Sequence, residues 1–184
     1  MDKTSQIRQV KKAVVLARKF HAGQVRKGPK GEAFYNHPRR VCKYYLTYKQ
    51  KSIAGMLASI CHDLVEDTAL SIEEIEGVFG MEVREIVSDL TKPDHFSSEE
   101  YAAEIGTWSL ESKKIKLCDI EDNILSSRAI DSNRRTCMLL RWKKYLDQLG
   151  KISSDGMAAQ KEFRHKWIAV NKLHTEELKG LTAG

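Results

Sequence analysis

No stretch of this 184-residue sequence approaches the roughly 20 consecutive apolar residues that cross a membrane. The first residues also lack the apolar run of a signal peptide. We therefore expect a cytoplasmic protein that makes no contact with a membrane. Closely paired cysteines are absent as well, which argues against a zinc knuckle or a disulfide framework. The widely spaced cysteines are expected to be small core residues: Cys42, Cys61, Cys118 and Cys137.

Persistent alternation of apolar and polar residues, the pattern of a β-strand, is also missing, and so are internal repeats and low-complexity segments. Charged residues make up 30% of the chain and apolar residues 41%, and the length suits one domain with a substantial core. A net charge of +6 indicates attraction to anions, but charge alone does not choose between nucleic acid, a membrane surface and a phosphorylated small molecule. The basic residues are spread among acidic ones, so a nucleic-acid partner is not expected.

Helical periodicity runs along most of the chain and predicts an all-α fold with one domain over residues 1–184. The N-terminal helix is expected to reach about residue 21, where glycines and basic residues mark a loop that continues to about residue 36. Ser71 and Glu74 have the spacing of a capping box, and Pro93 should end the helix before it. Further helices are expected over about residues 37–48, 71–80, 82–90, 97–108, 135–149 and 155–178. Another is expected to begin at about residue 53 and to continue into the segment 60–68, and one more to begin at about residue 115.

The segment 60–68, ICHDLVEDT, is the most informative part of the chain, because it places a histidine and three carboxylates close together beside an apolar stretch. On a helix, His62 and Asp63 would lie next to Glu66 and Asp67 one turn later. The apolar run before the cluster would carry these charges inward, where they are costly unless paired, and a bound metal ion would resolve that conflict. The alternative is a solvated acidic helix end in which a backbone carbonyl satisfies His62.

Two other polar residues stand apart in apolar or helix-terminal positions: His37, which precedes Pro38, and Asp119. Taken separately, each has an ordinary explanation as a helix-terminal or core hydrogen-bonding residue. Together with His62 and Asp63 they form a set of histidines and aspartates drawn from several helices. Such mixed ligands suit manganese, iron, cobalt or zinc, whereas magnesium prefers oxygen ligands, and the absence of thiolates argues against a structural zinc site.

The order of these residues resembles the H…HD…D signature of the HD-domain phosphohydrolases. More narrowly, the chain resembles the hydrolase domain of the RelA/SpoT homologues, which degrade guanosine tetra- and pentaphosphate alarmones, and in particular the small alarmone hydrolases, including the metazoan SpoT homologue. The resemblance covers about residues 10–150 and implies an HD-domain helical bundle, with the C-terminal helix at about 155–178 packing on it. The motifs are HAGQVRKG at 21–28, NHP at 36–38, HDLVEDT at 62–68, FGMEV at 79–83, LTK at 90–92 and IKLCDIEDN at 115–123.

The resemblance implies a site for one divalent metal ion, with manganese as the expected ion. Glu66 and Asp67 match the family's ED pair, whose implied role is to orient or deprotonate the attacking water. Their alternative explanation is a pair of ordinary solvated carboxylates. The implied metal ligands are His37, His62, Asp63 and Asp119.

Substrate-binding residues are also implied by the resemblance. Arg26 and Lys27 match the RK loop that contacts the nucleotide, and Asn123 matches an asparagine near the sugar and base. Arg141 and Tyr145 recur at a spacing found in the metazoan homologue, where such residues approach substrate phosphate; an exposed arginine and a core tyrosine are the alternative explanation.

The chain departs from the family pattern at two places near these residues. Phe34 stands where the family usually has tyrosine, which puts one polar contact to the nucleotide in doubt although Phe34 keeps its place in the binding set. Ile120 follows Asp119 where the family usually has arginine or lysine, which removes a charge but not a ligand.

The expected activity is therefore manganese-dependent hydrolysis of the 3′-pyrophosphate of guanosine tetra- or pentaphosphate, giving GDP or GTP and pyrophosphate. Two alternatives stay open. One is an HD phosphohydrolase acting on another nucleotide, such as the adenosine alarmone or the 2′-phosphate of NADPH. The other is a non-catalytic protein that binds an alarmone or acts as an antitoxin, against which the intact Glu66 and Asp67 argue. The residues do not indicate an oligomeric state.

Overall fold

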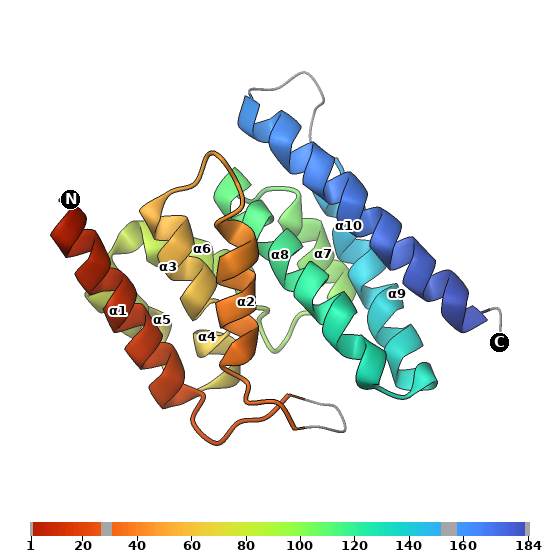
Figure 1. Cartoon of the computed structure of the whole chain (residues 1–184), viewed down its shortest axis with the longest axis horizontal. Coiled ribbons are helices and arrows are strands. Elements are labelled where there is room, and N and C mark those ends of the chain that lie inside the picture. Colours follow the sequence, from red (N-terminus) through yellow and green to blue (C-terminus); the bar gives the residue numbers. More distant parts are fainter. Residues whose placement is uncertain (1, 27–30, 152–157, 183–184) are drawn as a thin grey trace.

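The computed structural model of the chain describes residues 2–26, 31–151 and 158–182. Within these ranges the regular structure is helical, and β-pairing is limited to an isolated antiparallel bridge between Val25 and Ala33, so the all-α prediction is confirmed. Helix α1 lies at one edge of the molecule and α10 at the other (Figure 1). The elements are α1 Lys3–Phe20, α2 Asn36–Tyr45, α3 Ile53–Cys61, α4 Leu64–Asp67, α5 Ile72–Phe79, α6 Met81–Leu90, α7 Ser98–Ile105, α8 Leu110–Ser126, the 3-10 turn η1 Ser127–Ala129, α9 Ser132–Leu149 and α10 Ala158–Thr182.

Helix α8 is the centre of the fold. It packs against α2, α3 and α6 on the side of the N-terminal helices and against α9 and α10 on the other side. Because α8 has neighbours on both sides, apolar residues such as Ile115, Ile120 and Ile124 are fully buried, and polar residues such as Asp119 and Asp122 are buried with them. A helix that is buried on several faces shows little amphipathic pattern in its sequence.

Most expected helices are present, with shifted ends. The capping boxes at Ser71 and Ser97 are both formed, as the sequence predicts for Ser71 with Glu74. Helix α2 ends at Tyr45 rather than at 48, and α7 ends at Ile105 rather than at 108. Two helices begin earlier than expected because a side chain caps the first turn, Ser109 for α8 and Asp131 for α9. The expected start of the last helix, residue 155, lies outside the described residues.

The acidic cluster does not lie on one continuous helix, contrary to the prediction. Helix α3 ends at Cys61, and a short helix α4 begins at Leu64, so that His62 and Asp63 form the turn between them. The His62 ring nitrogen Nδ1 lies 3.1 Å from the Ser59 carbonyl oxygen, which is the acceptor that the Asp63 amide would use in an uninterrupted helix. The break therefore turns the two side chains toward the interior while α4 carries Glu66 and Asp67.

The core contains three of the expected cysteines, Cys42, Cys61 and Cys118, and all are buried. Cys137 is exposed, so its assignment to the core was wrong. It lies on α9, on a part of the helix that is not covered by α7, α8 or α10. None of the described helices is long and apolar enough to span a bilayer.

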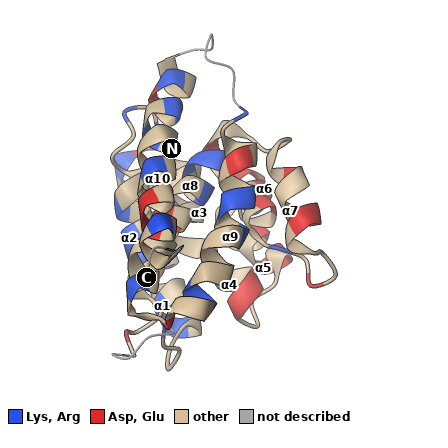
Figure 2. Ribbon diagram, turned by 90° about the vertical axis from the view of Figure 1, so that its right-hand side faces the viewer, with Lys and Arg blue, Asp and Glu red and all other residues tan. Residues whose placement is uncertain are grey.

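Charge is unevenly distributed over the helices. Acidic side chains gather around α5, α6 and α7, whereas α1 carries basic residues and has no acidic residue between Lys3 and Phe20 (Figure 2). The net positive charge of the chain is therefore not a uniform property of its surface. The electrostatic field of such an uneven charge distribution affects how an anionic ligand approaches the protein, but it does not determine the fold.

Gly55 of α3 is required for close packing and provides a test of the fold. A Cβ atom on Gly55 would overlap the Tyr45 hydroxyl and the Glu111 carboxylate, which are hydrogen-bonded to each other. We expect Gly55→Ala to lower the free energy of unfolding by about 1–3 kcal/mol, the usual cost of overpacking. Chemical denaturation would measure the change.

Gly77 of α5 is the matched control. It is also helical, but nothing lies within 4 Å of the position that its Cβ would take. We expect Gly77→Ala to raise the free energy of unfolding by up to about 1 kcal/mol through helix propensity alone. Equal stabilities of the two variants would contradict the packing described for α3.

Candidate active site

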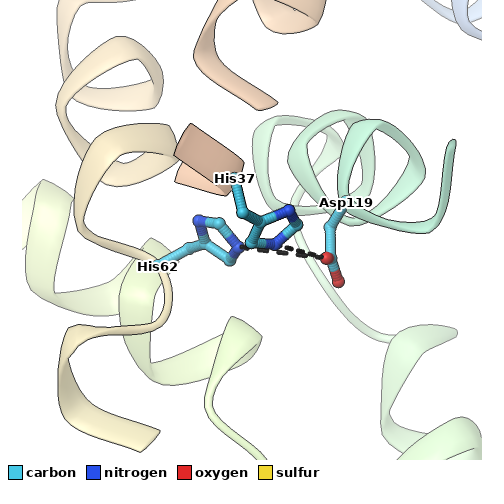
Figure 3. A group of neighbouring side chains, drawn as sticks. All are labelled: His37, His62 and Asp119. Atoms are coloured by element: carbon cyan, nitrogen blue, oxygen red, sulfur yellow. Dashed lines mark hydrogen bonds and ion pairs between the residues drawn. The ribbon is translucent and has the colours of Figure 1, made fainter. Parts of the chain in front are cut away.

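Two helices and one turn bring the predicted metal ligands together. His37 is the second residue of α2, His62 and Asp63 form the turn after α3, and Asp119 lies in the middle of α8. One potential ligand atom each from His37, His62 and Asp119 lies within 4.8 Å of the others, and Figure 3 shows these side chains pointing toward one another. Asp63 lies beside them, with its carboxylate oxygens 3.0 Å from His62 Nε2 and 3.3 Å from His37 Nε2.

Hydrogen bonds on the outer side of each imidazole fix which ring nitrogen faces this centre. His62 Nδ1 is directed at the Ser59 carbonyl oxygen, and His37 Nδ1 lies 2.7 Å from the Asp122 carboxylate. Since both acceptors require a protonated Nδ1, the Nε2 atoms face inward, 3.2 Å apart. Histidines that bind metals are commonly oriented in this way.

The electrostatics of the centre favour a positive charge. Burial lowers the pKa of His37, but hydrogen bonds with the surrounding aspartates outweigh it and raise the pKa to about 10. Burial raises the pKa of Asp63 and of Asp119, yet neighbouring positive charges hold both pKa values below their usual range. Inward-facing imidazole nitrogens and ionised carboxylates fit a divalent first-row metal ion, because its charge would offset the carboxylates.

Glu66 and Asp67 lie on α4 at the edge of the same centre, and both line a cavity that His37, Asp63 and Asp119 also reach. Glu66 Oε2 accepts a hydrogen bond of 3.0 Å from the Lys92 amide, and the Asp67 carbonyl accepts one of 2.8 Å from Gln24 Nε2. Burial, together with the charges of Asp63 and Glu66, raises the pKa of Asp67 to about 6. A carboxylate with such a pKa can take up and release a proton near neutral pH.

The cavity has a volume of about 390 Å³, within the range of small-molecule sites, and its wall combines charged and apolar groups. Every described residue that the sequence singled out for substrate binding lines it, whereas Lys27 lies outside the described residues. Trp142 is 4% exposed and also reaches the wall. The predicted residues that line the cavity are Arg26, Phe34, Asn123, Arg141 and Tyr145.

Arg26 connects the loop before α2 to α8. Its Nη2 atom donates a 2.6 Å hydrogen bond to Asn123 Oδ1, and its guanidinium carbon lies 5.7 Å from the centre of the Phe34 ring. Asn123 in turn donates through Nδ2 to Asp119 Oδ1 at 2.5 Å. Phe34 has no hydroxyl to offer, but its ring lies edge-on to His37, so it shapes the cavity next to the metal centre.

His21 has a structural role. Its Nδ1 atom lies 2.7 Å from Gln24 Oε1, and its ring stacks on Phe34 with centroids 4.7 Å apart. Because Gln24 also holds the Asp67 carbonyl, the contact joins the end of α1 to α4.

The motifs quoted above contain two further functional candidates that were not assigned a role from the sequence. Lys116 lines the cavity, with Nζ 3.0 Å from Asp119 Oδ2 and over the rings of Tyr101 and Tyr145. Asp122 contacts His37 from outside the cavity. Lys116 and Asp122 each lie three residues from Asp119 on α8, and this helical spacing is the signal that could have identified them.

A comparison with protein families matches the model of the HD domain to residues 13–125, a range that contains all four predicted metal ligands. The chain belongs to the HD domain family. This result confirms the resemblance to the HD-domain proteins and accounts for the helical bundle.

Curated proteins similar to this HD-domain chain include alarmone enzymes. Human guanosine-3′,5′-bis(diphosphate) 3′-pyrophosphohydrolase MESH1 is 36% identical over 89 residues, which cover 47% of this chain and 49% of MESH1. The bifunctional (p)ppGpp synthase/hydrolase SpoT of Escherichia coli is 33% identical over 89 residues, covering 48% of this chain and 12% of SpoT. The chain thus matches about half the length of MESH1 and a much smaller part of SpoT.

Solved structures extend the similarity over most of this HD-domain chain. The structure of a metazoan ortholog of SpoT, described as hydrolyzing ppGpp, superposes with a TM-score of 0.75 at 23% identity and covers 92% of this chain and 96% of its own. The structure of lmo0812 from Listeria monocytogenes has a TM-score of 0.67 at 20% identity, and the match covers 81% of this chain and 98% of lmo0812. At these identities the superpositions establish the shared fold.

Proposed function

We propose that this chain is a divalent-metal-dependent hydrolase that cleaves the 3′-pyrophosphate of guanosine tetra- and pentaphosphate to give pyrophosphate and GDP or GTP. The observation that carries the proposal is a single cavity in which Glu66 and Asp67 lie next to the clustered histidines and aspartates. The names of the similar human and Escherichia coli proteins support the substrate class. We further propose that residues 1–184 act as one hydrolase domain in the cytoplasm.

His37, His62, Asp63 and Asp119 are the residues proposed to hold the metal ion, through imidazole Nε2 atoms and carboxylate oxygens. A bound divalent ion would lower the pKa of a coordinated water and polarise a phosphoryl oxygen. Manganese is proposed because it accepts both nitrogen and oxygen ligands, as this mixed set requires.

Glu66 and Asp67 are proposed to manage the proton of the attacking water. The water oxygen bonds to the phosphorus attached to the 3′ oxygen, while the bond between that phosphorus and the 3′ oxygen breaks. The water gives up a proton to this carboxylate pair, and the 3′ oxygen takes up a proton to leave as a hydroxyl. The raised pKa of Asp67 suits it to hold that proton in transit.

Cationic side chains around the cavity are proposed to bind the polyphosphate. Arg26, Lys116 and Arg141 all reach its wall, and each can form a charge-assisted hydrogen bond to a phosphate oxygen. Arg26 lies next to Phe34 and Asn123, so the base and sugar are proposed to bind on that side. Tyr145 also lines the cavity and lies on α9, four residues after Arg141.

Turnover of the manganese-loaded protein on guanosine tetraphosphate, its adenosine counterpart and NADPH would test the proposal, with chromatography to identify each product. We expect GDP and pyrophosphate from the guanosine alarmone. Faster turnover of the adenosine alarmone or of NADPH would reassign the substrate within the same chemistry. Nucleotide affinity without turnover of any of them would instead indicate a binding or antitoxin function.

Removal of the metal should abolish turnover. After treatment with a chelator and its removal, we expect Mn²⁺ to restore activity more effectively than Mg²⁺, because two of the proposed ligands are imidazoles. Turnover measured at a fixed free concentration of each ion would check this. Full activity in the continued presence of chelator would contradict a metal-dependent reaction.

Loss of Arg26 should weaken substrate binding more than it slows the chemical step. We expect Arg26→Met to raise KM for guanosine tetraphosphate about 10-fold or more, since a hydrogen bond to a charged group contributes roughly 1.5–3 kcal/mol. The control is Arg8→Met, which removes the same charge from an exposed position on α1. Steady-state kinetics would check both variants, and equal KM values would remove Arg26 from the binding set.

A further inference from the structure

The carboxylate of Asp122 is buried beneath the proposed metal centre and is almost completely enclosed by polar partners. Its side chain is 1% exposed. Asp122 Oδ2 lies 2.7 Å from His37 Nδ1, and Oδ1 accepts a 2.5 Å hydrogen bond from Arg40 Nε. Arg40 Nη2 and the Ser126 hydroxyl also contact Oδ2, at 3.1 and 3.4 Å. Burying an ionised carboxylate is costly, and these contacts compensate for the lost water.

Asp122 holds His37 in the orientation that a metal ligand needs. As an acceptor at Nδ1, the carboxylate leaves Nε2 as the nitrogen available to a metal ion, and this atom lies 3.3 and 3.2 Å from the Asp63 and Asp119 carboxylates. A carboxylate on the outer nitrogen also increases the basicity of an imidazole ligand. Asp122 itself does not line the cavity, so it acts through His37.

Arg40 extends the contact from Asp122 to the loop before α2. The same guanidinium pairs with the Glu32 carboxylate, with Nη2 3.2 Å from Oε2 and a second hydrogen bond from Nη1 to Oε1. The backbone carbonyl of Glu32 accepts a 2.7 Å hydrogen bond from the Arg26 amide. One arginine fork thus joins a buried carboxylate to the segment that presents a cavity residue.

A second route leads from that segment back to the metal centre. The Arg26 guanidinium binds Asn123, and Asn123 binds Asp119, at 2.6 and 2.5 Å. The contacts therefore form a closed circuit between two proposed metal ligands, one on α2 and the other on α8. The circuit runs through His37, Asp122, Arg40, Glu32, Arg26, Asn123 and Asp119.

We infer that Asp122 and Arg40 are a positioning pair that holds His37 for the metal ion and couples occupancy of the metal site to the backbone hydrogen bonds of Arg26 and Phe34. The inference rests on the proposed function, because it requires that the site bind a metal. It assigns to this pair an indirect role, without contact to the substrate.

Direct measurement of Mn²⁺ affinity by calorimetry tests the first half of the inference. We expect Asp122→Asn to bind Mn²⁺ about 10- to 100-fold more weakly than the wild type, the usual effect of losing an outer-shell carboxylate. Arg40→Met should also bind more weakly, and it covers the case in which Asp122→Asn fails to fold. The control is Arg39→Met, which removes an exposed arginine from the adjacent position of α2.

The possible outcomes separate this inference from the proposed function. If the wild type binds Mn²⁺, and Arg40→Met or a folded Asp122→Asn protein binds it equally well, the inference is overturned and the proposed function is not. A wild type that binds no divalent ion would overturn both.

Hydrogen exchange tests the coupling to the loop and does not depend on activity. The amides to follow are those of Arg26 and Phe34, which donate to the Glu32 and Gln24 carbonyls. We expect saturating Mn²⁺ to slow their exchange in the wild type and in Arg39→Met, and to have at least several-fold less effect in Arg40→Met. Equal protection in Arg40→Met would overturn the coupling. The Gly80 amide at the end of α5 serves as an internal reference.

Discussion

Replacement of Asp63 by alanine is expected to remove both bound metal and turnover. Asp63 contacts both inward-facing imidazole nitrogens, at 3.0 and 3.3 Å, and its pKa is held well below the usual range, so it brings a full negative charge to the centre. Without Asp63, the proposed metal site would have one anionic ligand fewer. The metal content of the purified protein should then fall below one-tenth of the wild-type value. Elemental analysis and turnover on guanosine tetraphosphate would measure the two effects.

Asp94→Ala is the control for this experiment, since Asp94 is an exposed aspartate outside the described cavity. It should keep the metal content and turnover of the wild type. If Asp63→Ala retained a full complement of metal with its helical content unchanged, Asp63 would not be a ligand. The centre would then be limited to His37, His62 and Asp119.

Replacement of Glu66 by glutamine is expected to separate catalysis from metal binding. The amide is nearly the same size and can still accept the hydrogen bond from the Lys92 backbone, but it cannot take up a proton from water. We expect turnover to fall by about 10²- to 10⁴-fold, the range typical of a lost general base, with the metal content unchanged. Rapid-quench or steady-state assays with metal analysis of the same sample would check this.

Glu73→Gln, an exposed carboxylate in the first turn of α5, provides the matched control and should have wild-type kinetics. A wild-type rate in Glu66→Gln would show that Glu66 does not handle the proton, and Asp67, with its pKa raised to about 6, would become the principal candidate. Loss of metal in Glu66→Gln would instead indicate that the carboxylate contributes to the metal site.

Local sequence signals predicted the helices well where a side chain and its partner are close in the sequence. The capping box at Ser71 is such a case, because its partners are three residues apart and need no tertiary contact. The break between α3 and α4 was not predictable in this way. It depends on the His62 ring turning back to the Ser59 carbonyl, an arrangement that the apolar pattern of the segment does not encode.

The candidate site was predictable as a set of residues but not as a network. His37, His62, Asp63 and Asp119 were identified by motif, and the fold places them together, although binding of a metal by them stays a prediction. Arg40 and Asp122 were not identified. They lie 82 residues apart and meet only because α2 packs against α8. The sequence around either residue therefore does not indicate that the two are in contact.

In the proposed reaction, water attacks the phosphorus attached to the 3′ oxygen of a guanosine alarmone. Turnover of guanosine tetraphosphate by the manganese-loaded protein in ¹⁸O-labelled water, with mass analysis of the separated products, would identify the phosphorus that is attacked. We expect unlabelled GDP and pyrophosphate carrying one ¹⁸O atom, because the bond between phosphorus and the 3′ oxygen is the one that breaks. Label in the GDP, release of orthophosphate, or no turnover with metal bound would contradict the proposed reaction.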